Sequence, residues 1–347
     1  MKTFFSNMKK RNLYFLIATV AVLLLTRSIA VTLGFIFLFG TPLYFMKELP
    51  LYATTGERIW QYAFLTICTF IFVFLITPIL VIVPLSFNVE PYFTFTEGML
   101  SLDSNAYSLR WYKDIFHNGM TNPEATTGWW ADMWNNAQWV RAARNSFFIA
   151  ICSTILATTL GTLAALGLSQ PNMPYRNLIT SLLISPMIVP LVIMATGMFF
   201  FYSDVGLSGT YLGIILAHTT LGVPFVIITV TATLTGFDRS LIRASQNMGA
   251  DGVTTFRRII MPLILPGMIS GALFAFITSL DEVVAVLFLA DVDQRTIPRQ
   301  MFSGIREQIS PTILAVATLL VIMSIGLLTV VELLRRRSER LRGLAPS

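Results

Sequence analysis

Two adjacent acids, Asp281 and Glu282, are the residues best suited to chemistry, because they lie well inside a run of apolar residues. An ionised carboxylate within a membrane is costly unless it faces water, protein or a cation. Neighbouring residues on a helix point about 100° apart, so one acid could face a solute path while the other faces a helix. Asp281 is our first candidate for lining such a path. The alternative is that both acids mark the outer end of the run or cap the following turn.

Residue patterns of common enzymes are missing from the sequence. It holds no GxxxxGK(S/T) phosphate loop, no HExxH and no GxSxG. The two cysteines, Cys68 and Cys152, lie in apolar runs, and the two histidines, His117 and His218, lie far apart, so neither a disulfide scaffold nor a metal site is indicated. For His218 we favour a hydrogen-bonded packing role over a proton or substrate site. We expect no catalytic residue and no bound cofactor.

Composition indicates an integral membrane protein. Of the 347 residues, 55% are hydrophobic and only 12% are charged, a balance that a water-soluble domain could not bury. The net charge of +6 comes from residues in short loops and near the C-terminus, without a basic stripe interleaved with aromatics. We therefore interpret the charge as a signal of membrane topology, and we expect no nucleic-acid partner.

Six apolar runs are long enough to cross a bilayer, which takes roughly 20 helical residues. They cover residues 62–87, 146–168, 178–201, 211–234, 263–289 and 311–334. Arg335, Arg336 and Arg337 follow the last run, and positive residues favour the cytoplasmic side. The sequence predicts an all-α, multi-pass membrane protein with a cytoplasmic C-terminus. Arg141 and Arg144, on the outer side, run against this bias.

The chain is expected to divide into three parts. Residues 1–61 form a hydrophobic extension of uncertain topology, for which one crossing, two short crossings and a surface helix all remain open. Residues 62–342 form the transmembrane domain, and residues 343–347 form a cytoplasmic tail.

A polar segment at about residues 235–262 separates the fourth and fifth runs. Asp238 or Ser240 can cap a first helix. Gly249 can end that helix in a left-handed turn, after which a second short helix can run until Pro262. The segment is therefore predicted to form a bent helical knob in the cytoplasm.

The order of residues in this segment resembles the coupling motif of binding-protein-dependent permeases of ABC importers. That motif runs Glu-Ala-Ala, three residues, Gly, nine residues, then Ile-x-Leu-Pro. Matching positions are Ala244, Gly249, Ile259 and Pro262, whereas Arg243, Ser245 and Met261 replace the Glu, the second Ala and the Leu. The resemblance implies a six-helix type I importer core in a bacterial inner (plasma) membrane, whose coupling loop seats on an ATPase subunit. It implies coupling roles for Arg243, Ala244, Ser245, Gly249, Ala250, Ile259 and Pro262.

Further stretches are similar to permeases of spermidine and putrescine importers: residues 108–112, 279–284 and 297–301. The resemblance implies a polyamine as the solute and Asp281 and Glu282 as tentative path residues. It also implies membrane lipid, a cytoplasmic ATPase dimer carrying ATP and Mg, a second homologous permease and a periplasmic solute-binding protein as partners. Other solutes of related permeases remain open, namely an opine, an amino acid derivative or ferric ion, as does an ion-coupled secondary transporter.

Overall fold

The computed structural model describes residues 19, 54–170, 172–235, 238, 240–307 and 310–341. The chain divides into two units, Met1–Pro84 and Leu85–Ser347, each described here by itself. Helices dominate the described residues, and the only strand-like pairing among them is an isolated bridge between Asn88 and Tyr107. Most of the expected N-terminal extension and the whole 343–347 tail lie outside the described residues.

In the first unit the structure describes Thr19 and residues 54–84, and nearly all of these lie in one long helix, α5 (Thr55–Leu85), whose last residue belongs to the second unit. Thr54 and Glu57 form a reciprocal cap: the Thr54 N–H donates to Glu57 Oε2 at 2.8 Å, and the Glu57 N–H donates to Thr54 Oγ1 at 3.3 Å. The expected boundary at residue 62 therefore falls inside a helix that begins seven residues earlier. With 31 residues, α5 is long enough to span a membrane.

Three close-packed helices form the centre of the second unit: α9 (Gln138–Leu168), α12 (Tyr211–Thr235) and α15 (Met261–Asp281). Glycines allow the close approach. A Cβ on Gly161 would lie 2.6 Å from Val226 Cβ, and one on Gly222 would lie 3.0 Å from Ala275 Cβ. Small residues at membrane helix contacts favour such packing because dispersion replaces the hydrophobic effect there.

The third predicted span is not one straight helix. The structure breaks it into α10 (Arg176–Ile188) and α11 (Leu191–Asp204), which are bent by 101°. Pro190 is the cause: it has no N–H to continue the hydrogen-bond ladder, and it forces Val189 into an extended conformation with ψ 135°. The run over 178–201 therefore forms two helices that meet at Pro190. Five helices in the described part of the chain are long and apolar enough to cross, or six with this bent pair as one.

The fifth predicted span is also interrupted. α15 ends at Asp281, Glu282 is extended with ψ 120°, and a separate short helix, α16 (Val284–Leu289), follows. The prediction of one continuous run to residue 289 was wrong at this point. The break places the two acids at a helix end.

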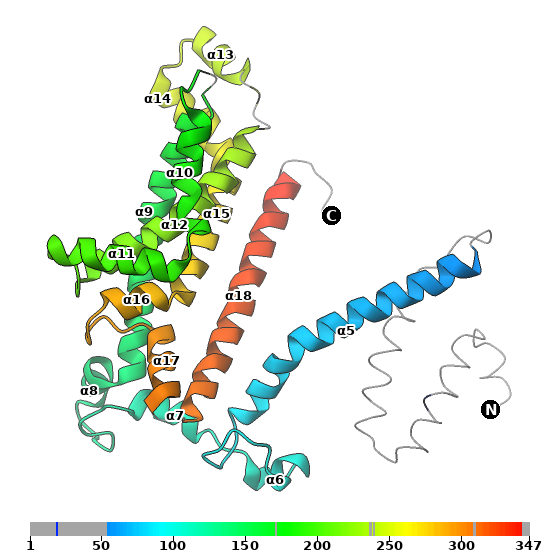
Figure 1. Ribbon diagram of the computed structural model, residues 1–347, viewed down its shortest axis with the longest axis vertical. Coiled ribbons are helices and arrows are strands. Elements are labelled where there is room, and N and C mark those ends of the chain that lie inside the picture. Colours follow the sequence, from blue (N-terminus) through cyan, green and yellow to red (C-terminus); the bar gives the residue numbers. More distant parts are fainter. Residues whose placement is uncertain are drawn as a thin grey trace. The chain divides into compact units, whose positions relative to one another are not determined.

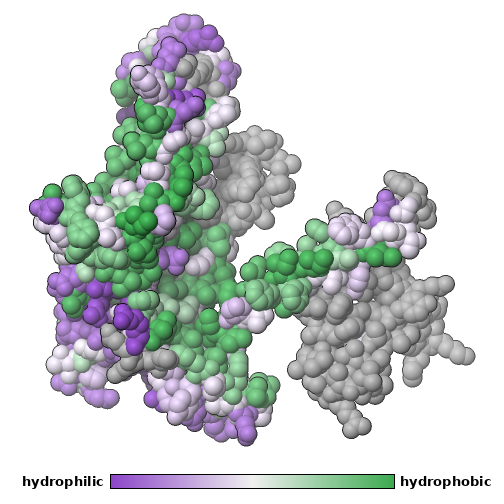
Figure 2. Space-filling view, viewed as in Figure 1, coloured by the Kyte–Doolittle hydropathy of each residue, from purple (hydrophilic) through white to green (hydrophobic). Residues whose placement is uncertain are grey.

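The remaining helices of the second unit lie at its two ends or along its side. α13 (Ser240–Asn247) and α14 (Gly252–Thr255) lie at one end, and α7 (Arg110–His117) and α8 (Trp129–Asn136) lie at the other (Figure 1). Three further helices are α6 (Glu97–Leu100), α17 (Ile297–Glu307) and α18 (Thr312–Leu341), and a 3-10 turn covers Ser104–Ala106. Hydrophobic side chains cover the surface between these hydrophilic ends (Figure 2).

Candidate functional site

The first helix of the knob, α13, begins at a carboxylate cap. Asp238 Oδ1 accepts from the Ser240 N–H at 2.8 Å, and Asp238 Oδ2 accepts from the Ser240 hydroxyl at 2.6 Å. These hydrogen bonds lower the pKa of Asp238, the one from the hydroxyl most strongly. Gly236, Phe237 and Arg239 lie outside the described residues.

Gly249 ends α13 in the left-handed conformation that the sequence predicts, with φ +81°. The Gly249 N–H donates to Gln246 O at 2.9 Å, and the Ala250 N–H donates to Ser245 O at 3.0 Å. This pair of bonds is the Schellman motif, which satisfies carbonyls at a helix C-terminus. A Cβ at Gly249 would meet nothing within 4 Å, so only the backbone conformation requires glycine here.

The second helix of the knob begins at Asp251, whose Oδ1 accepts from the Thr254 N–H at 3.1 Å. Hydrogen bonds with Thr254 lower the pKa of Asp251. The two helices are joined by a hydrogen bond of 2.9 Å between the hydroxyls of Ser245 and Thr255, both of which are buried. Ser245, a departure from the motif's second Ala, therefore holds the knob together.

The second helix does not end at Pro262, as the sequence suggested. A π-helical turn over Phe256–Ile260 connects α14 directly to α15, with the Met261 N–H donating to Phe256 O. Proline lacks an N–H and its ring crowds the carbonyl four residues earlier, so a widened turn at this place relieves the clash and lets the helix continue. The second helix of the knob is therefore continuous with α15.

A groove of about 760 Å³ lies between the two knob helices. Met248 is 88% exposed beside it, and Ala244 and Gly249 are exposed as well. The full lining is Leu241, Ala244, Ser245, Met248, Gly249, Ala250, Asp251, Thr254, Thr255, Arg258 and Ile259. Arg243 is exposed on α13 but does not line the groove. The predicted coupling residues Ala244, Ser245, Gly249, Ala250 and Ile259 are thus brought together on one surface that suits a protein contact.

The structure separates the two acids. Glu282 is only 6% exposed, and its Oε1 accepts from the Ala285 N–H at 2.8 Å, so it caps the N-terminus of α16. Asp281 is exposed at the end of α15. The capping alternative therefore describes Glu282, and Asp281 stays the candidate for contact with a solute.

A buried polar cluster ties the three central helices together close to these acids. His218 Nδ1 on α12 lies 2.7 Å from Ser279 Oγ on α15, and Ser153 Oγ on α9 donates to Ser279 Oγ at 3.1 Å. All three side chains are buried. His218 is a hydrogen-bonded packing residue, as the sequence favoured, whereas Ser153 and Ser279 were missed because a serine in an apolar run gives no local sign of its partner.

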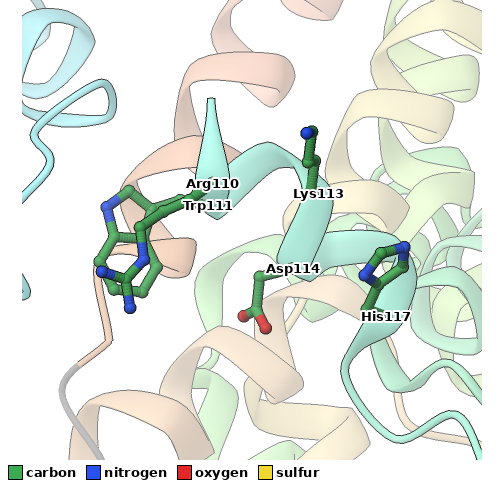
Figure 3. Close-up of a pocket in the computed structure, with 5 residues that line it drawn as sticks. All are labelled: Arg110, Trp111, Lys113, Asp114 and His117. Atoms are coloured by element: carbon green, nitrogen blue, oxygen red, sulfur yellow. The ribbon is translucent and has the colours of Figure 1, made fainter. Parts of the chain in front are cut away.

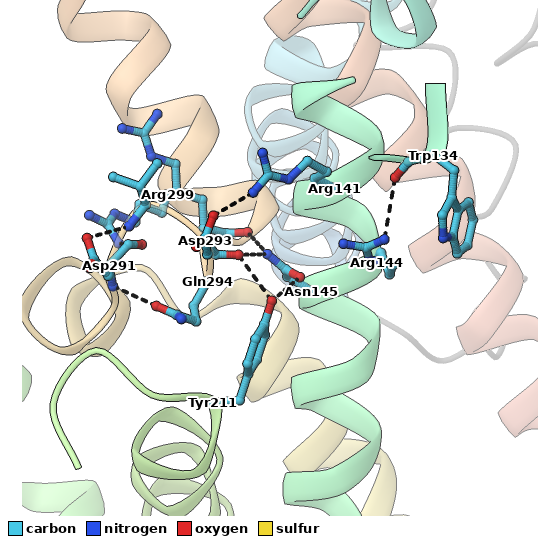
Figure 4. Close-up of polar contacts among 11 residues, drawn as sticks. Trp134, Arg141, Arg144, Asn145, Tyr211, Asp291, Asp293, Gln294 and Arg299 are labelled. Carbon is cyan, nitrogen blue, oxygen red and sulfur yellow. Dashed lines mark hydrogen bonds and ion pairs between the residues drawn. The ribbon is translucent and has the colours of Figure 1, made fainter. Parts of the chain in front are cut away.

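At the opposite end from the knob, Asn145 fixes the loop over residues 290–296 (Figure 4). Its amide donates to Asp293 O at 2.7 Å and to Arg295 O at 3.0 Å, and Tyr211 OH donates to its Oδ1 at 3.0 Å. Because Tyr211 starts α12 and Asn145 lies near the start of α9, the bent α10–α11 pair returns the chain to the end from which α9 began. The pair therefore counts as one crossing.

Three arginines at this end have partners. Arg141 forms an ion pair of 2.7 Å with Asp293, and Arg299 Nη1 donates to Ala290 O at 2.8 Å (Figure 4). Arg144 lies over the ring of Trp134 at 5.5 Å. These contacts give a structural reason for Arg141, Arg144 and Arg299 at this end of the bundle.

A small hollow of about 200 Å³ on α7 also carries charged side chains (Figure 3). Arg110 stacks over the ring of Trp111 at 4.4 Å, and Asp114 Oδ2 accepts from the Thr312 hydroxyl at 2.6 Å. Lys113 and His117 complete the lining. Arg110 and Lys113 outnumber the one carboxylate in this lining, Asp114, so the hollow favours a cation less than Asp281 does.

Comparisons with known proteins agree with this architecture. The family described as binding-protein-dependent transport system inner membrane component matches residues 157–342. The spermidine/putrescine transport system permease protein PotC of Haemophilus influenzae is 30% identical over 78% of this chain and 95% of its own length. The putrescine transport system permease protein PotI of Escherichia coli is 28% identical over 79% of this chain and 91% of its own.

A solved bacterial ABC transporter involved in the import of the acidic polysaccharide alginate has a chain of the same fold. It matches with a TM-score of 0.58 and 16% identity, over 82% of this chain and 99% of that chain. The expected all-α importer permease core is thereby confirmed. The chain belongs to the binding-protein-dependent transport permeases of bacterial inner membranes.

Proposed function

We propose that this permease imports a small polyamine, such as putrescine or spermidine, and that a separate ATPase dimer binds ATP and Mg and drives it. The observation that carries the solute class is the exposed carboxylate of Asp281 at a helix break, in a chain whose relatives are named as polyamine permeases. Amines with pKa values near that of lysine, about 10, are cationic at neutral pH. An accessible acid inside a membrane protein suits such a solute.

The knob groove is the proposed contact with the ATPase. Its apolar wall of Ala244, Met248 and Ile259 can bury against a partner, and Gly249 lets the chain turn beside it. Arg243 is exposed on α13, at the position where the usual motif has a Glu. We therefore expect the surface of the ATPase that contacts Arg243 to carry a carboxylate. Pro262 marks the turn through which the knob continues into α15.

This assignment orients the chain. If the knob is cytoplasmic, α18 also ends on the cytoplasmic side, because its last turns lie toward the same end as α13 (Figure 1). The α7–α8 end then faces the periplasm, where a solute-binding protein would dock. A second, homologous permease would complete the path, with lipid around the hydrophobic surface.

Uptake of labelled putrescine and spermidine tests the solute. We expect Asp281→Asn to raise KM at least tenfold and Asp281→Glu to restore most uptake, while Glu282→Gln should leave KM nearly unchanged and lower the amount of folded protein. Amino acids, opines and ferric chelates serve as competitors. Polyamine uptake that is insensitive to Asp281→Asn, or inhibited by one of these competitors, would count against the polyamine assignment.

A pair of glycine variants tests the coupling. A Cβ added at Gly249 or at Gly252 would meet nothing within 4 Å, but only Gly249 has a positive φ. Alanine at the left-handed position costs roughly 1–2 kcal/mol. We expect Gly249→Ala, and more strongly Gly249→Val, to leave ATP hydrolysis running without uptake, whereas Gly252→Ala behaves as wild type. Equal uptake in both glycine variants would refute the coupling role.

A further inference from the structure

A second groove, of about 540 Å³, lies on the knob side of the bundle, between α10, the end of α9 and α12. Its lining is Leu168, Arg176, Asn177, Thr180, Ser181, Ile184, Ile227, Ile228 and Thr231. The groove is open to the surroundings, and none of the residues that line it is an acid. It is separate from the groove inside the knob.

The polar residues of this groove form a stripe on α10. Asn177, Thr180 and Ser181 are spaced by three and four residues, which places them on one face of a helix. Leu178 and Leu182 lie on another face and are 69% and 70% exposed. An amphipathic helix at membrane depth has its polar face toward protein or water, because hydrocarbon cannot satisfy amides and hydroxyls.

The charges along the bundle differ between its two ends. Asp281 offers a carboxylate at the end of α15 remote from the knob, whereas this groove offers only neutral oxygens and the exposed Arg176. Transport requires sites that bind well enough to admit a solute and weakly enough to release it. A cation that reaches a neutral, Arg-flanked groove is held weakly.

We propose that this groove is the water-filled exit of the solute path, where the ammonium groups of the solute pass the oxygens of Asn177, Thr180 and Ser181 and where Arg176 favours release. The cationic nature of the solute rests on the proposed function; the assignment of the groove to the path does not. Lipid, or a helix of another chain, filling the groove would be a different outcome of the test below.

Cysteine accessibility distinguishes these occupants. In the full transporter with Cys68→Ser and Cys152→Ser, a membrane-impermeant, cationic methanethiosulfonate is applied to the cytoplasmic side of inside-out vesicles. We expect Ser181→Cys to react at least tenfold faster than the matched control Leu182→Cys. Saturating putrescine should slow the reaction at Ser181→Cys at least threefold and leave the control unchanged.

Each other result is decisive. Equal rates at the two positions, or no reaction at either, would mean that lipid or protein fills the groove and would overturn the proposal. Fast reaction at Ser181→Cys that no transported solute slows would also overturn it, because the groove would then hold water outside the path. Protection by a different solute, but not by putrescine, would keep the exit assignment and reject the polyamine function.

Discussion

Replacing Asn145 by Asp should destabilise the end of the bundle that lies opposite the knob. The Asn145 amide donates to the carbonyls of Asp293 and Arg295, and Asn145 is 3% exposed. A carboxylate of the same shape has no hydrogen to donate and would face both carbonyl oxygens. Leaving a buried acceptor unpaired costs about 1–3 kcal/mol. Two such acceptors give a loss of about 2–6 kcal/mol in unfolding free energy.

Unfolding of the purified protein in mixed micelles, followed while the fraction of SDS rises, measures this loss. Tyr211→Phe is the matched control, since it removes only the hydroxyl that lies 3.0 Å from Asn145 Oδ1 and 3.1 Å from Asp293 O, and it should cost about 1 kcal/mol. Asn145→Ala should lie between the two, because it removes the donors without adding a charge. If Asn145→Asp unfolds at the same SDS fraction as wild type, or later than Tyr211→Phe, the inferred role of Asn145 is wrong.

Three further predictions concern packing and the knob. Gly161→Leu, which meets Val226 at once, should lower the yield of folded protein strongly, whereas Gly167→Leu, which meets nothing within 4 Å, should be tolerated; size-exclusion chromatography in detergent compares them. Ser245→Ala and Thr255→Val should each loosen the knob but show little additional effect together, because they share one hydrogen bond; a double-mutant cycle on amide exchange tests this. Asp251 has a lowered pKa in the folded chain, so its contribution to the order of the knob should be constant from pH 8 to 5 and decline as pH falls through its ordinary value of 3.8; Asp251→Ala should abolish this pH dependence of amide exchange.

Features that depend on neighbouring residues could be predicted from the sequence. The left-handed ending at Gly249 and the cap at Asp238 follow from local backbone chemistry, and the structure contains both. The breaks at Pro190 and Glu282 could not be predicted from hydropathy, because an apolar run has the same composition whether its helix is straight or bent by 101°. Proline inside a membrane helix is often tolerated, so Pro190 alone did not require a break.

Features that depend on distant residues were beyond sequence reasoning. Asn145 meets the 290–296 loop across about 150 positions, and His218 meets Ser279 across 61. Asp281 and Glu282 look equivalent in sequence, yet only Glu282 turns back to cap α16. Such roles follow from which face of a helix a neighbour covers, and one sequence does not give that neighbour.

The continuous helix from Gly252 to Asp281 gives the knob a direct mechanical connection to the acid. Its 30 residues extend about 45 Å between the knob and Asp281. The buried contact among His218, Ser279 and Ser153 holds this helix against α9 and α12 near its far end and can act as the fulcrum. Between the knob and this buried contact, the π turn over Phe256–Ile260 is the least regular part of the helix. Under the proposed function, a movement of the knob that the ATPase drives would reach Asp281 as a rotation of α15 about this buried contact, without unwinding the helix.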